Sequence, residues 1–350
     1  MKEMKKSNIK LSIVLPCYKV EKYLNRCLNS LTEQTLKEIE VICINDGSPD
    51  KCVNIIKSYI KKYGSKIKLI DKKNEGLWQA RIDGIRVAQG QYIGFVDGDD
   101  YVDITFAEKL YNCAINTKAD ICVCGYERKD DITGKIYSKE MCWDSKKIID
   151  VQNEKGKLLE INTALWNKIY KRELFVNVYD LKSRPTVIED AILLQLLYPK
   201  SNKITFINES LYNYMVRNGS NINTVYKDRI EVTYKSMIEA RNICEKKSPE
   251  FLDYYDANAF IHLGISFMLM LSNDNTLNFG KTIRDNTKIL NTYFINWKNN
   301  EYLKFSYVIN NKGTNLKPWI VKIVYSLHLF KPFILFYKFF TKKIGIDIKW

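Results

Sequence analysis

The chain has 350 residues, of which 46% are hydrophobic and 27% are charged, and its formal net charge is +15. These values are typical of a globular protein that is long enough for one large domain and an appended smaller one. Nine scattered cysteines without a Cys-x-x-Cys pair, and only two histidines, argue against a zinc centre and predict buried, reduced thiols. The basic charge is compatible with nucleic acid, an anionic membrane surface or a phosphate-bearing substrate.

The first 125 residues alternate between short apolar runs and segments with apolar residues at helical spacing. The apolar runs predict strands at 11–16, 40–44, 67–70, 92–96 and 121–124. The intervening segments predict helices near 24–31, 53–63, 76–88 and 106–115. Strands that alternate with helices through short links predict an α/β fold with a mainly parallel sheet, in which ligands bind beyond the carboxyl ends of the strands.

After residue 126 the pattern is weaker. Residues 127–160 are polar and irregular, whereas 166–175 and 191–198 have the spacing of helices. From about 226 onward the chain is predicted to be mostly helical, with polar gaps near 272–278 and 308–315.

Polar residues follow three of the predicted strands. These are Pro16-Cys17-Tyr18, then Asn45-Asp46-Gly47-Ser48, then Asp97-Gly98-Asp99-Asp100. Each motif alone could be a turn. Because parallel strands bring their carboxyl ends to one edge of the sheet, the three motifs together favour a ligand site there.

Three aspartates within 97–100 would repel one another unless a cation or solvent relieves them. Carboxylate oxygens suit a hard divalent cation that is shared with substrate phosphates, and Gly98 lets the main chain approach a bulky ligand. The alternative is a solvated cap of the next helix, with Asp103 before it. A calcium loop of the EF-hand type is rejected, because Val102 stands at its glycine position.

The first 100 residues resemble the family 2 glycosyltransferases of the bacterial polysaccharide or surface-glycan type, which share the GT-A nucleotide-sugar-binding fold. The resemblance rests on four motifs in the family's order: 12–18, 45–48, 74–81 and 95–100. It is strong over 10–110 and thinner over 160–220. The chain departs from the common pattern at Asn45, where the family often has aspartate, and at Gly98, where it often has serine.

The resemblance implies a donor site for a nucleotide-sugar, more readily a UDP-sugar than a guanosine one. Asp46 would accept a hydrogen bond from the uracil ring N–H, and Asp99, helped by Asp97, would hold Mg²⁺ or Mn²⁺ against the diphosphate. Arg81 would contact the diphosphate, although it could also be a surface arginine. The implied donor-binding residues are Pro16, Tyr18, Asp46, Asn74, Gly76, Arg81, Asp97 and Gly98.

The family's second half carries a Glu-Asp pair, and Glu189-Asp190 precedes an apolar helical segment here. The resemblance implies that Asp190 is the base that takes the acceptor hydroxyl's proton and that Glu189 orients the acceptor. Attack opposite to the leaving group would invert the anomeric centre. Two carboxylates at a helix start could instead serve only the helix. Coordinates that separate Asp190 from Asp99 would end this interpretation.

Three further residues resemble family segments that flank this pair. Trp166 could stack on a sugar or belong to the core, Lys168 lies beside it, and Arg217 could reach the diphosphate or the acceptor.

Residues 316–350 carry seven lysines and one acid, a net charge of +6. The tail 317–350 is also rich in phenylalanine, and it predicts one or two interfacial helices on an anionic membrane, interrupted near Pro332. The alternative is a helix that packs on the protein. No apolar stretch reaches the length of a spanning helix, and the N-terminus lacks a secretory apolar core. We therefore expect a cytoplasmic location, peripheral on the inner face of the membrane.

The sequence thus predicts a catalytic GT-A domain over 1–225, with a donor half at about 10–125 and an acceptor half at about 126–225. A helical region over 226–350 follows. The predicted reaction is an inverting, metal-assisted hexosyl or N-acetylhexosaminyl transfer to a glycan or lipid-linked acceptor. A sugar nucleotidyltransferase and a non-catalytic scaffold are the alternatives, and nucleic-acid binding is not expected because no binding module accompanies the charge.

Overall fold

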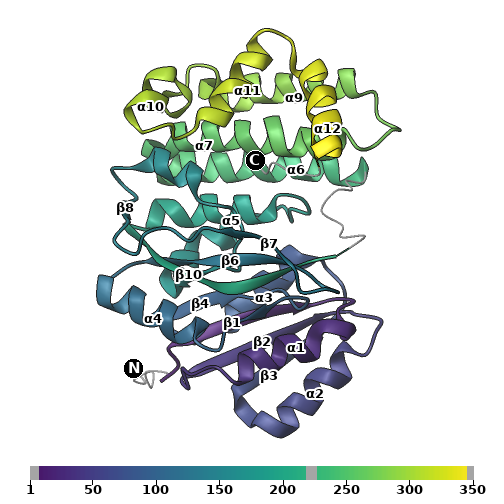
Figure 1. Cartoon of the computed structure of the whole chain (residues 1–350), viewed down its shortest axis with the longest axis vertical. Coiled ribbons are helices and arrows are strands. Elements are labelled where there is room, and N and C mark those ends of the chain that lie inside the picture. The colour runs from purple at the N-terminus through teal and green to yellow at the C-terminus, as the bar shows by residue number, and fades with distance from the viewer. Residues whose placement is uncertain (1–7, 218–226, 345–350) are drawn as a thin grey trace. The chain divides into compact units, whose positions relative to one another are not determined.

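The computed structural model describes residues 8–217 and 227–344. Contacts within the chain divide these residues into two compact units (Figure 1). Unit 1 comprises 8–153, 163–179 and 196–217, and unit 2 comprises 154–162, 180–195 and 227–344. In this division 154–162 and 180–195 group with the helical region, and the predicted boundary near 225 stays a prediction.

Unit 1 is built on a mixed sheet that has ten strands within the described ranges, in the order β3-β2-β1-β4-β9-β6-β10-β5, with β7 beside β6 and β8 beside β10. The strands are β1 Leu11–Cys17, β2 Ile39–Asp46, β3 Ile67–Lys72, β4 Tyr92–Phe95, β5 Tyr101–Val102, β6 Ile121–Asp130, β7 Ile136–Glu140, β8 Ile148–Asp150, β9 Lys168–Lys171 and β10 Lys203–Val216. Strands β3, β2, β1 and β4 are mutually parallel, and β10 is parallel to β6. The other pairings, which involve β5, β7, β8 and β9, are antiparallel.

Helices cover both faces of the parallel strands, which explains why β1 and β2 are buried along their whole length. Helices α1 (Glu21–Thr32), α2 (Cys52–Tyr63) and α4 (Phe106–Thr117) share one core with alternate residues of β1, beginning with Leu11. Helix α3 (Leu77–Val87) packs on β1 through Gly84, where a Cβ atom would lie 2.4 Å from Val14 Cγ1. This close approach places the start of α3 beside the carboxyl edge of the sheet.

The strands and helices predicted before residue 125 are all confirmed, with ends shifted by a few residues. The helix predicted over 166–175 is wrong. Ile169 and Tyr170 lie in β9, which is antiparallel to both β4 and β6, and a 3-10 segment, Arg172–Asp180, follows. The pairing buries both side chains, so tertiary context outweighs the local helical spacing.

Strand β10 was not predicted, yet it is the longest strand described, with 14 residues. Its register against β6 shifts between Ile207 and Tyr212, which marks a bulge. Beyond the bulge, Tyr212 and Asn213 also pair with β5, the short strand that directly follows the acidic motif. The second half of β10 therefore runs beside the 97–100 loop.

Unit 2 is helical, as expected for the region after 226. Its helices are α5 Glu189–Leu197, whose last two residues belong to unit 1, α6 Lys227–Lys247, α7 Leu252–Ala259, α8 Met268–Leu271, α9 Phe279–Tyr293, α10 Phe305–Asn310, α11 Leu316–Ser326 and α12 Phe330–Ile344, with a π-helical segment, Phe260–Phe267, between α7 and α8. Trp297 and Phe260 stack in its core with ring centroids 4.9 Å apart. In the described part of the chain, every helix is too short or too polar to cross a membrane.

Candidate donor-binding site

The three predicted motifs meet at the carboxyl edge of the parallel strands. Cys17 at the end of β1 is in register with Asn45 on β2, and Asp46 pairs with Lys72 on β3. On the other side of β1, Val14 pairs with Phe95, two residues before the acidic motif. The expectation that these loops share one edge is therefore met by the strand register.

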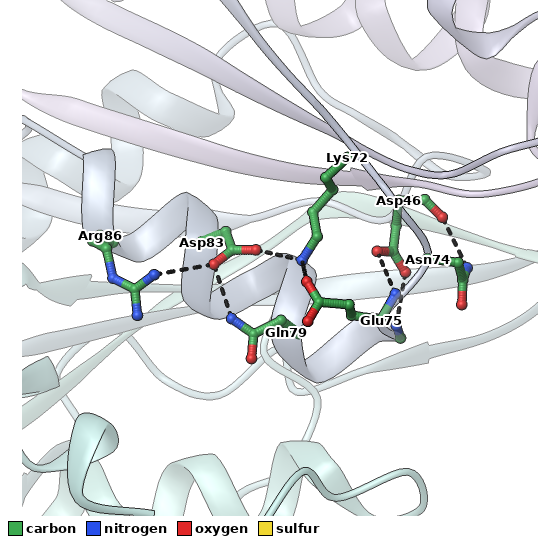
Figure 2. Close-up of polar contacts among 8 residues, drawn as sticks. Asp46, Lys72, Asn74, Glu75, Gln79, Asp83 and Arg86 are labelled. Atoms are coloured by element: carbon green, nitrogen blue, oxygen red, sulfur yellow. Dashed lines mark hydrogen bonds and ion pairs between the residues drawn. The ribbon is translucent and has the colours of Figure 1, made fainter. Parts of the chain in front are cut away.

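Asp46 anchors the loop that leads into α3. Its Oδ1 accepts a hydrogen bond from the Glu75 amide at 2.9 Å and its Oδ2 accepts one from the Gly76 amide at 2.8 Å (Figure 2). The Asn74 side chain donates to the main-chain carbonyl of Asp46 at 2.8 Å. A carboxylate has about four lone-pair sites, so these two bonds leave further acceptor capacity.

Glycine is required on both sides of the contact between Asp46 and the loop 74–76. Gly47 has a φ of +63°, and a Cβ atom there would lie 2.6 Å from the Asn74 amide nitrogen. Gly76 has a φ of +90° as it turns the chain into α3. Both conformations favour glycine because it has no Cβ atom.

Lys72 ties the same loop to α3. Its Nζ lies 2.5 Å from Glu75 Oε2 and 2.5 Å from Asp83 Oδ2, between the two carboxylates (Figure 2). Asp83 also accepts hydrogen bonds from Gln79 at 2.9 Å and from Arg86 at 3.3 Å. The loop that carries Asn74 and Gly76 is thus held at both ends by charged side chains.

The first motif leaves an aromatic ring at the surface. Pro16 is buried within β1, whereas Tyr18 is 43% exposed and the Lys19 Nζ lies 5.1 Å from its ring centroid. The Lys19 amide donates to Ser48 Oγ at 2.8 Å, which joins this loop to the second motif. An exposed ring at this edge is suited to stack on a planar base.

Asp50 joins the two loops, and the sequence did not single it out. It accepts hydrogen bonds from the Ser48 hydroxyl at 2.7 Å, the Glu21 amide at 3.0 Å and the Cys52 amide at 3.1 Å. Burial by itself would raise the pKa of Asp50, but the bonds from Cys52, Ser48 and Glu21 prevail and lower it to about 2. The carboxylate therefore stays charged in its capping position at neutral pH.

Asp97 and Asp99 present partly exposed carboxylates with arginines beside them. The Asp97 side chain is 29% exposed, and its Oδ1 lies 3.5 Å from Arg81 Nη2. The Asp99 side chain is 31% exposed and forms an ion pair with Arg217. Arg81 is buried, so its alternative as a surface arginine is excluded.

Asp100 has a different environment from its two neighbours. It is 1% exposed, and it accepts hydrogen bonds from the Tyr212 hydroxyl and the Met215 amide, both at 2.8 Å. Burial, together with the charges of Asp99 and Asp97, raises the pKa of the Asp100 carboxyl well above its ordinary value, against the lowering effect of these two bonds.

Asp103 makes the turn before α4, which agrees with the alternative that this segment caps the helix. Asp97 and Asp99 do not take part in that turn, and the contact is made by Asp103. Its Oδ1 accepts from the Thr105 amide at 2.8 Å. Gly98 packs closely against the first motif, with a Cβ atom there 3.1 Å from the Pro16 carbonyl oxygen. The glycine thus brings the acidic loop against the loop of Pro16.

The carboxylates of Asp97 and Asp99 suit a divalent cation that a bound ligand also coordinates. They do not suit a metal site made of protein ligands alone. No three histidine, cysteine or acidic residues gather into a metal-binding group within 8–217 and 227–344. Mg²⁺ commonly takes one or two carboxylates and completes its shell with water and substrate phosphates. Asp97 and Asp99 match that pattern, and each already attracts a cationic guanidinium.

Arg217 follows the end of β10. Its guanidinium carbon lies 4.3 Å from the ring centroid of Tyr23, at a distance typical of a cation–π contact. Burial lowers the pKa of Arg217, but the Asp99 carboxylate beside it prevails and raises the pKa. The structure thus places this predicted residue at the acidic motif.

Trp166 and Lys168 lie inside unit 1. Trp166 is 8% exposed and stacks on Tyr212 with ring centroids 4.3 Å apart, which favours the core alternative over sugar stacking. Lys168 is fully buried, and its Nζ donates to the Ala164 carbonyl at 2.6 Å and to Asn167 Oδ1 at 2.7 Å. These placements argue against direct ligand contact by either side chain.

Glu189 and Asp190 form the first turn of α5 and belong to unit 2. The residue before them, Ile188, has a φ of +52°, which is strained for a β-branched residue. Such strain is found preferentially at functional sites.

The fold and this edge together define an α/β protein whose candidate ligand site combines an aromatic ring, an anchored glycine loop and paired carboxylates and arginines. The family description "Glycosyl transferase family 2" matches residues 12–178. The glycosyltransferase GlyG of Streptococcus pneumoniae is 30% identical over 241 residues, which are 65% of this chain and 79% of that one. The chain belongs to glycosyltransferase family 2, whose members are enzymes that transfer sugars.

Other relatives are longer, and this chain spans only 31% and 29% of the length of two of them. One is the minor teichoic acid biosynthesis protein GgaB of Bacillus subtilis, which is 30% identical over 71% of this chain. Among solved structures, residues 1–349 of S. aureus TarS in complex with UDP-GlcNAc match with a TM-score of 0.67 and 19% identity, over 91% of this chain and 92% of that one. This likeness shows that the fold of the chain is that of a GT-A glycosyltransferase with a helical extension.

Proposed function

We propose that the chain is an inverting glycosyltransferase that moves a hexosyl or N-acetylhexosaminyl group from a UDP-sugar to a hydroxyl of a glycan or lipid-linked acceptor. The observation that carries the proposal is the meeting of the Asp46 loop and the Asp97–Asp99 carboxylates at one edge of the sheet. The UDP-GlcNAc of the TarS complex supports the nucleotide, as a property of that protein.

The residues of unit 1 would bind the donor from the base to the phosphates. Tyr18 would stack on the uracil, and Asp46 would accept the ring N–H while it keeps Asn74 and Gly76 in place. The guanidinium of Arg81, at the Asp97 side of the same edge, would donate hydrogen bonds to the diphosphate.

Asp97 and Asp99 would hold Mg²⁺ or Mn²⁺ beside the diphosphate. The cation, when bound, supplies positive charge that stabilises the departing nucleoside diphosphate. Arg217, which forms an ion pair with Asp99, would add its charge to the same group.

Asp190 would accept the proton of the acceptor hydroxyl through a carboxylate oxygen, and Glu189 would orient the acceptor. A hydroxyl activated on the face opposite to the diphosphate gives inversion, as with the base of an inverting glycosidase. The strained backbone of Ile188 directly before the pair supports a functional role for this turn.

The acceptor is proposed to belong to a bacterial surface polymer, because GgaB is named for teichoic acid biosynthesis. Helix α12 exposes phenylalanines, and α11 and α12 both expose a lysine; this composition suits an anionic membrane surface, where a lipid-linked acceptor would lie. We therefore infer a cytoplasmic enzyme that is peripheral on the inner face of the cell membrane.

A donor screen tests the proposed reaction. The full chain is incubated with each common UDP-sugar and with Mn²⁺ or Mg²⁺, and the release of UDP is measured with and without EDTA. We expect release from one or a few UDP-sugars that EDTA abolishes. No release from any UDP-sugar, or pyrophosphate formation from UTP and a sugar phosphate, would refute the proposal.

A further inference from the structure

The buried member of the acidic motif points away from its neighbours' side chains and toward β10. Asp100 Oδ2 accepts the Tyr212 hydroxyl hydrogen, and Asp100 Oδ1 accepts the Met215 amide hydrogen, at 2.8 Å each. Since the residue is 1% exposed and both oxygens are engaged within the protein, Asp100 is not placed to be a ligand of a cation.

The Tyr212 hydroxyl also accepts a hydrogen bond from the Asp97 amide at 3.2 Å. One hydroxyl therefore joins the first and the last aspartate of the motif. Its ring is fully buried and stacks on Trp166, which also stacks on Tyr214 with ring centroids 5.6 Å apart. A ring that is buried and stacked in this way has little freedom to move, so the Tyr212 hydroxyl holds the loop in one position.

The main chain of the loop is held on a second side by α1. Arg26 Nη2 donates to the Asp99 carbonyl at 3.2 Å, and it also donates to Asp131 Oδ1 at 3.0 Å. The loop 97–100 is thus bonded through the Asp97 amide, the Asp99 carbonyl and the Asp100 side chain, while the carboxylates of Asp97 and Asp99 stay partly exposed.

The same contact sets the end of β10. Met215, whose amide is bonded to Asp100, lies two residues before Arg217, the partner of the Asp99 carboxylate. A short span of chain therefore links the Asp100 bond to the position of the guanidinium.

We propose that Asp100 and Tyr212 are positioning residues, which fix the carboxylates of Asp97 and Asp99 and the guanidinium of Arg217 in the arrangement that receives a nucleoside diphosphate with its divalent cation. The ligand class rests on the proposed function. The two side chains do not touch the ligand, and they act by holding the acidic loop and the end of β10 together.

Two variants break this connection in different ways. Tyr212→Phe keeps the ring on Trp166 but deletes the hydroxyl that joins the Asp97 amide to Asp100. Asp100→Asn keeps the shape, but its amide group turns one acceptor into a donor toward the Tyr212 hydroxyl. Tyr92→Phe is the matched control: its ring is equally buried and its hydroxyl donates to the Ala119 carbonyl at 2.7 Å, but it lies at the opposite end of β4.

The measurement is the affinity of the full chain for UDP by calorimetry, with Mn²⁺ and with EDTA. For wild type and Tyr92→Phe we expect Mn²⁺ to tighten UDP binding. In Tyr212→Phe and Asp100→Asn the ratio of the UDP affinity with Mn²⁺ to that with EDTA should fall about tenfold. This is the size of effect expected for the loss of a hydrogen bond to a charged group. Binding in EDTA should fall less than binding with Mn²⁺, because the contacts to the base do not depend on this connection and only the Arg217 contact to the diphosphate is lost without the metal.

Each outcome decides the matter. An unchanged Mn²⁺ gain in Tyr212→Phe would overturn the inference, as would an equal loss of UDP affinity with and without Mn²⁺, which would show general damage to the fold. If Asp100→Asn does not fold, Tyr212→Phe decides alone. A wild-type protein that binds UDP no better with Mn²⁺ would instead refute the proposed function, and that result is seen before any variant is made.

Discussion

Asp46 and Asp100 are both buried carboxylates at the candidate donor site, and both accept hydrogen bonds from backbone amides. Asp46 organises the loop before α3, whereas Asp100 organises the loop after β4. Two aspartates therefore have different structural roles, and the environment of each side chain determines its role.

Replacing Asp46 with asparagine should weaken UDP binding about tenfold or more, because the amide group can no longer accept from both the Glu75 and the Gly76 amides. The affinity is measured by calorimetry. Asp120→Asn is the matched control, since Asp120 Oδ2 also accepts two backbone amides, from Asn202 at 2.7 Å and Lys203 at 3.3 Å, but at the amino edge of the sheet. Equal affinities in the two variants would count against a donor role for Asp46.

Replacing Asp190 with asparagine should lower the rate of transfer by about 10²–10⁴-fold, the range for loss of a general base, and should leave UDP-sugar binding unchanged. Single-turnover transfer and donor affinity are measured side by side. Asp180→Asn, which removes the charge of another carboxylate of unit 2, should keep the wild-type rate. Turnover in Asp190→Asn at the wild-type level would remove Asp190 from the mechanism.

The sequence predicted which loops form the candidate donor site but could not assign a role to each of their residues. Apolar runs that end in polar residues revealed the strand ends of β1, β2 and β4, and the parallel sheet then placed Tyr18, Asp46 and Asp97 at one edge. Three aspartates in a row look alike in sequence, however. Only the contacts with β10 show that Asp100 is buried, whereas the Asp99 side chain stays partly exposed.

At the scale of elements, β10 escaped prediction because its bulge breaks the alternation of apolar and polar residues. Glu209 and Ser210 fall between the two buried halves of the strand, and the register against β6 shifts there. The helical spacing at 166–175 led to a wrong prediction, because β4 and β6 pair with that segment from both sides and make it a strand. Long-range pairing of this kind is invisible to a local pattern.

The π-helical segment of unit 2 contains a buried histidine that should make this unit sensitive to acid. Burial lowers the pKa of His262 from 6.5 to about 4. The folded protein therefore resists protonation that the unfolded chain accepts. The resulting stability is complete above pH ~6.5 and is lost as the pH falls toward ~4, by on the order of 3 kcal/mol.

His262→Gln should remove this part of the pH dependence, as measured by urea unfolding followed through the helical signal at pH 7 and pH 4.5. His328→Asn is the control, because His328 is exposed and is the only other histidine of the chain. Both variants share the titration of the carboxylates, so the difference between them isolates His262. An equal loss of stability on acidification in the two variants would contradict the assignment.

At the scale of the whole molecule, the C-terminal helices have two faces, so the two alternatives for the tail are not exclusive. Phe330 and Ile334 of α12 are buried, and the Tyr325 hydroxyl of α11 donates to the Gly264 carbonyl at 2.5 Å. The helical structure is interrupted between Ser326, where α11 ends, and Phe330, where α12 begins. The interruption therefore lies before Pro332 and not at it. Lys338 Nζ donates to the Ser272 carbonyl, so this lysine belongs partly to the packed face.

The outward face of α12 carries large apolar side chains, and exposed lysines stand in both helices. Phe336 and Phe339 are 66% and 67% exposed. Lys317 and Lys331 are exposed as well, and 302–344 contain no acidic residue. Aromatic rings beside lysines are the composition of a surface that inserts shallowly into an anionic leaflet. Attraction to the lipid headgroups then adds to the burial of the rings.

This face predicts vesicle binding that point substitutions can remove without harm to the fold. Truncation of α11 and α12 would strip buried residues from unit 2, whereas Phe336→Ser with Phe339→Ser changes only exposed ones. The double variant should lose about tenfold or more in binding to phosphatidylglycerol-containing vesicles, measured by co-sedimentation. Ile132→Ser, at an 87% exposed position of unit 1, should bind like wild type. Because lysines contribute, wild-type binding should also weaken at 0.5 M salt and on neutral vesicles. Equal sedimentation of the double variant and the wild type would show that this face does not bind the membrane.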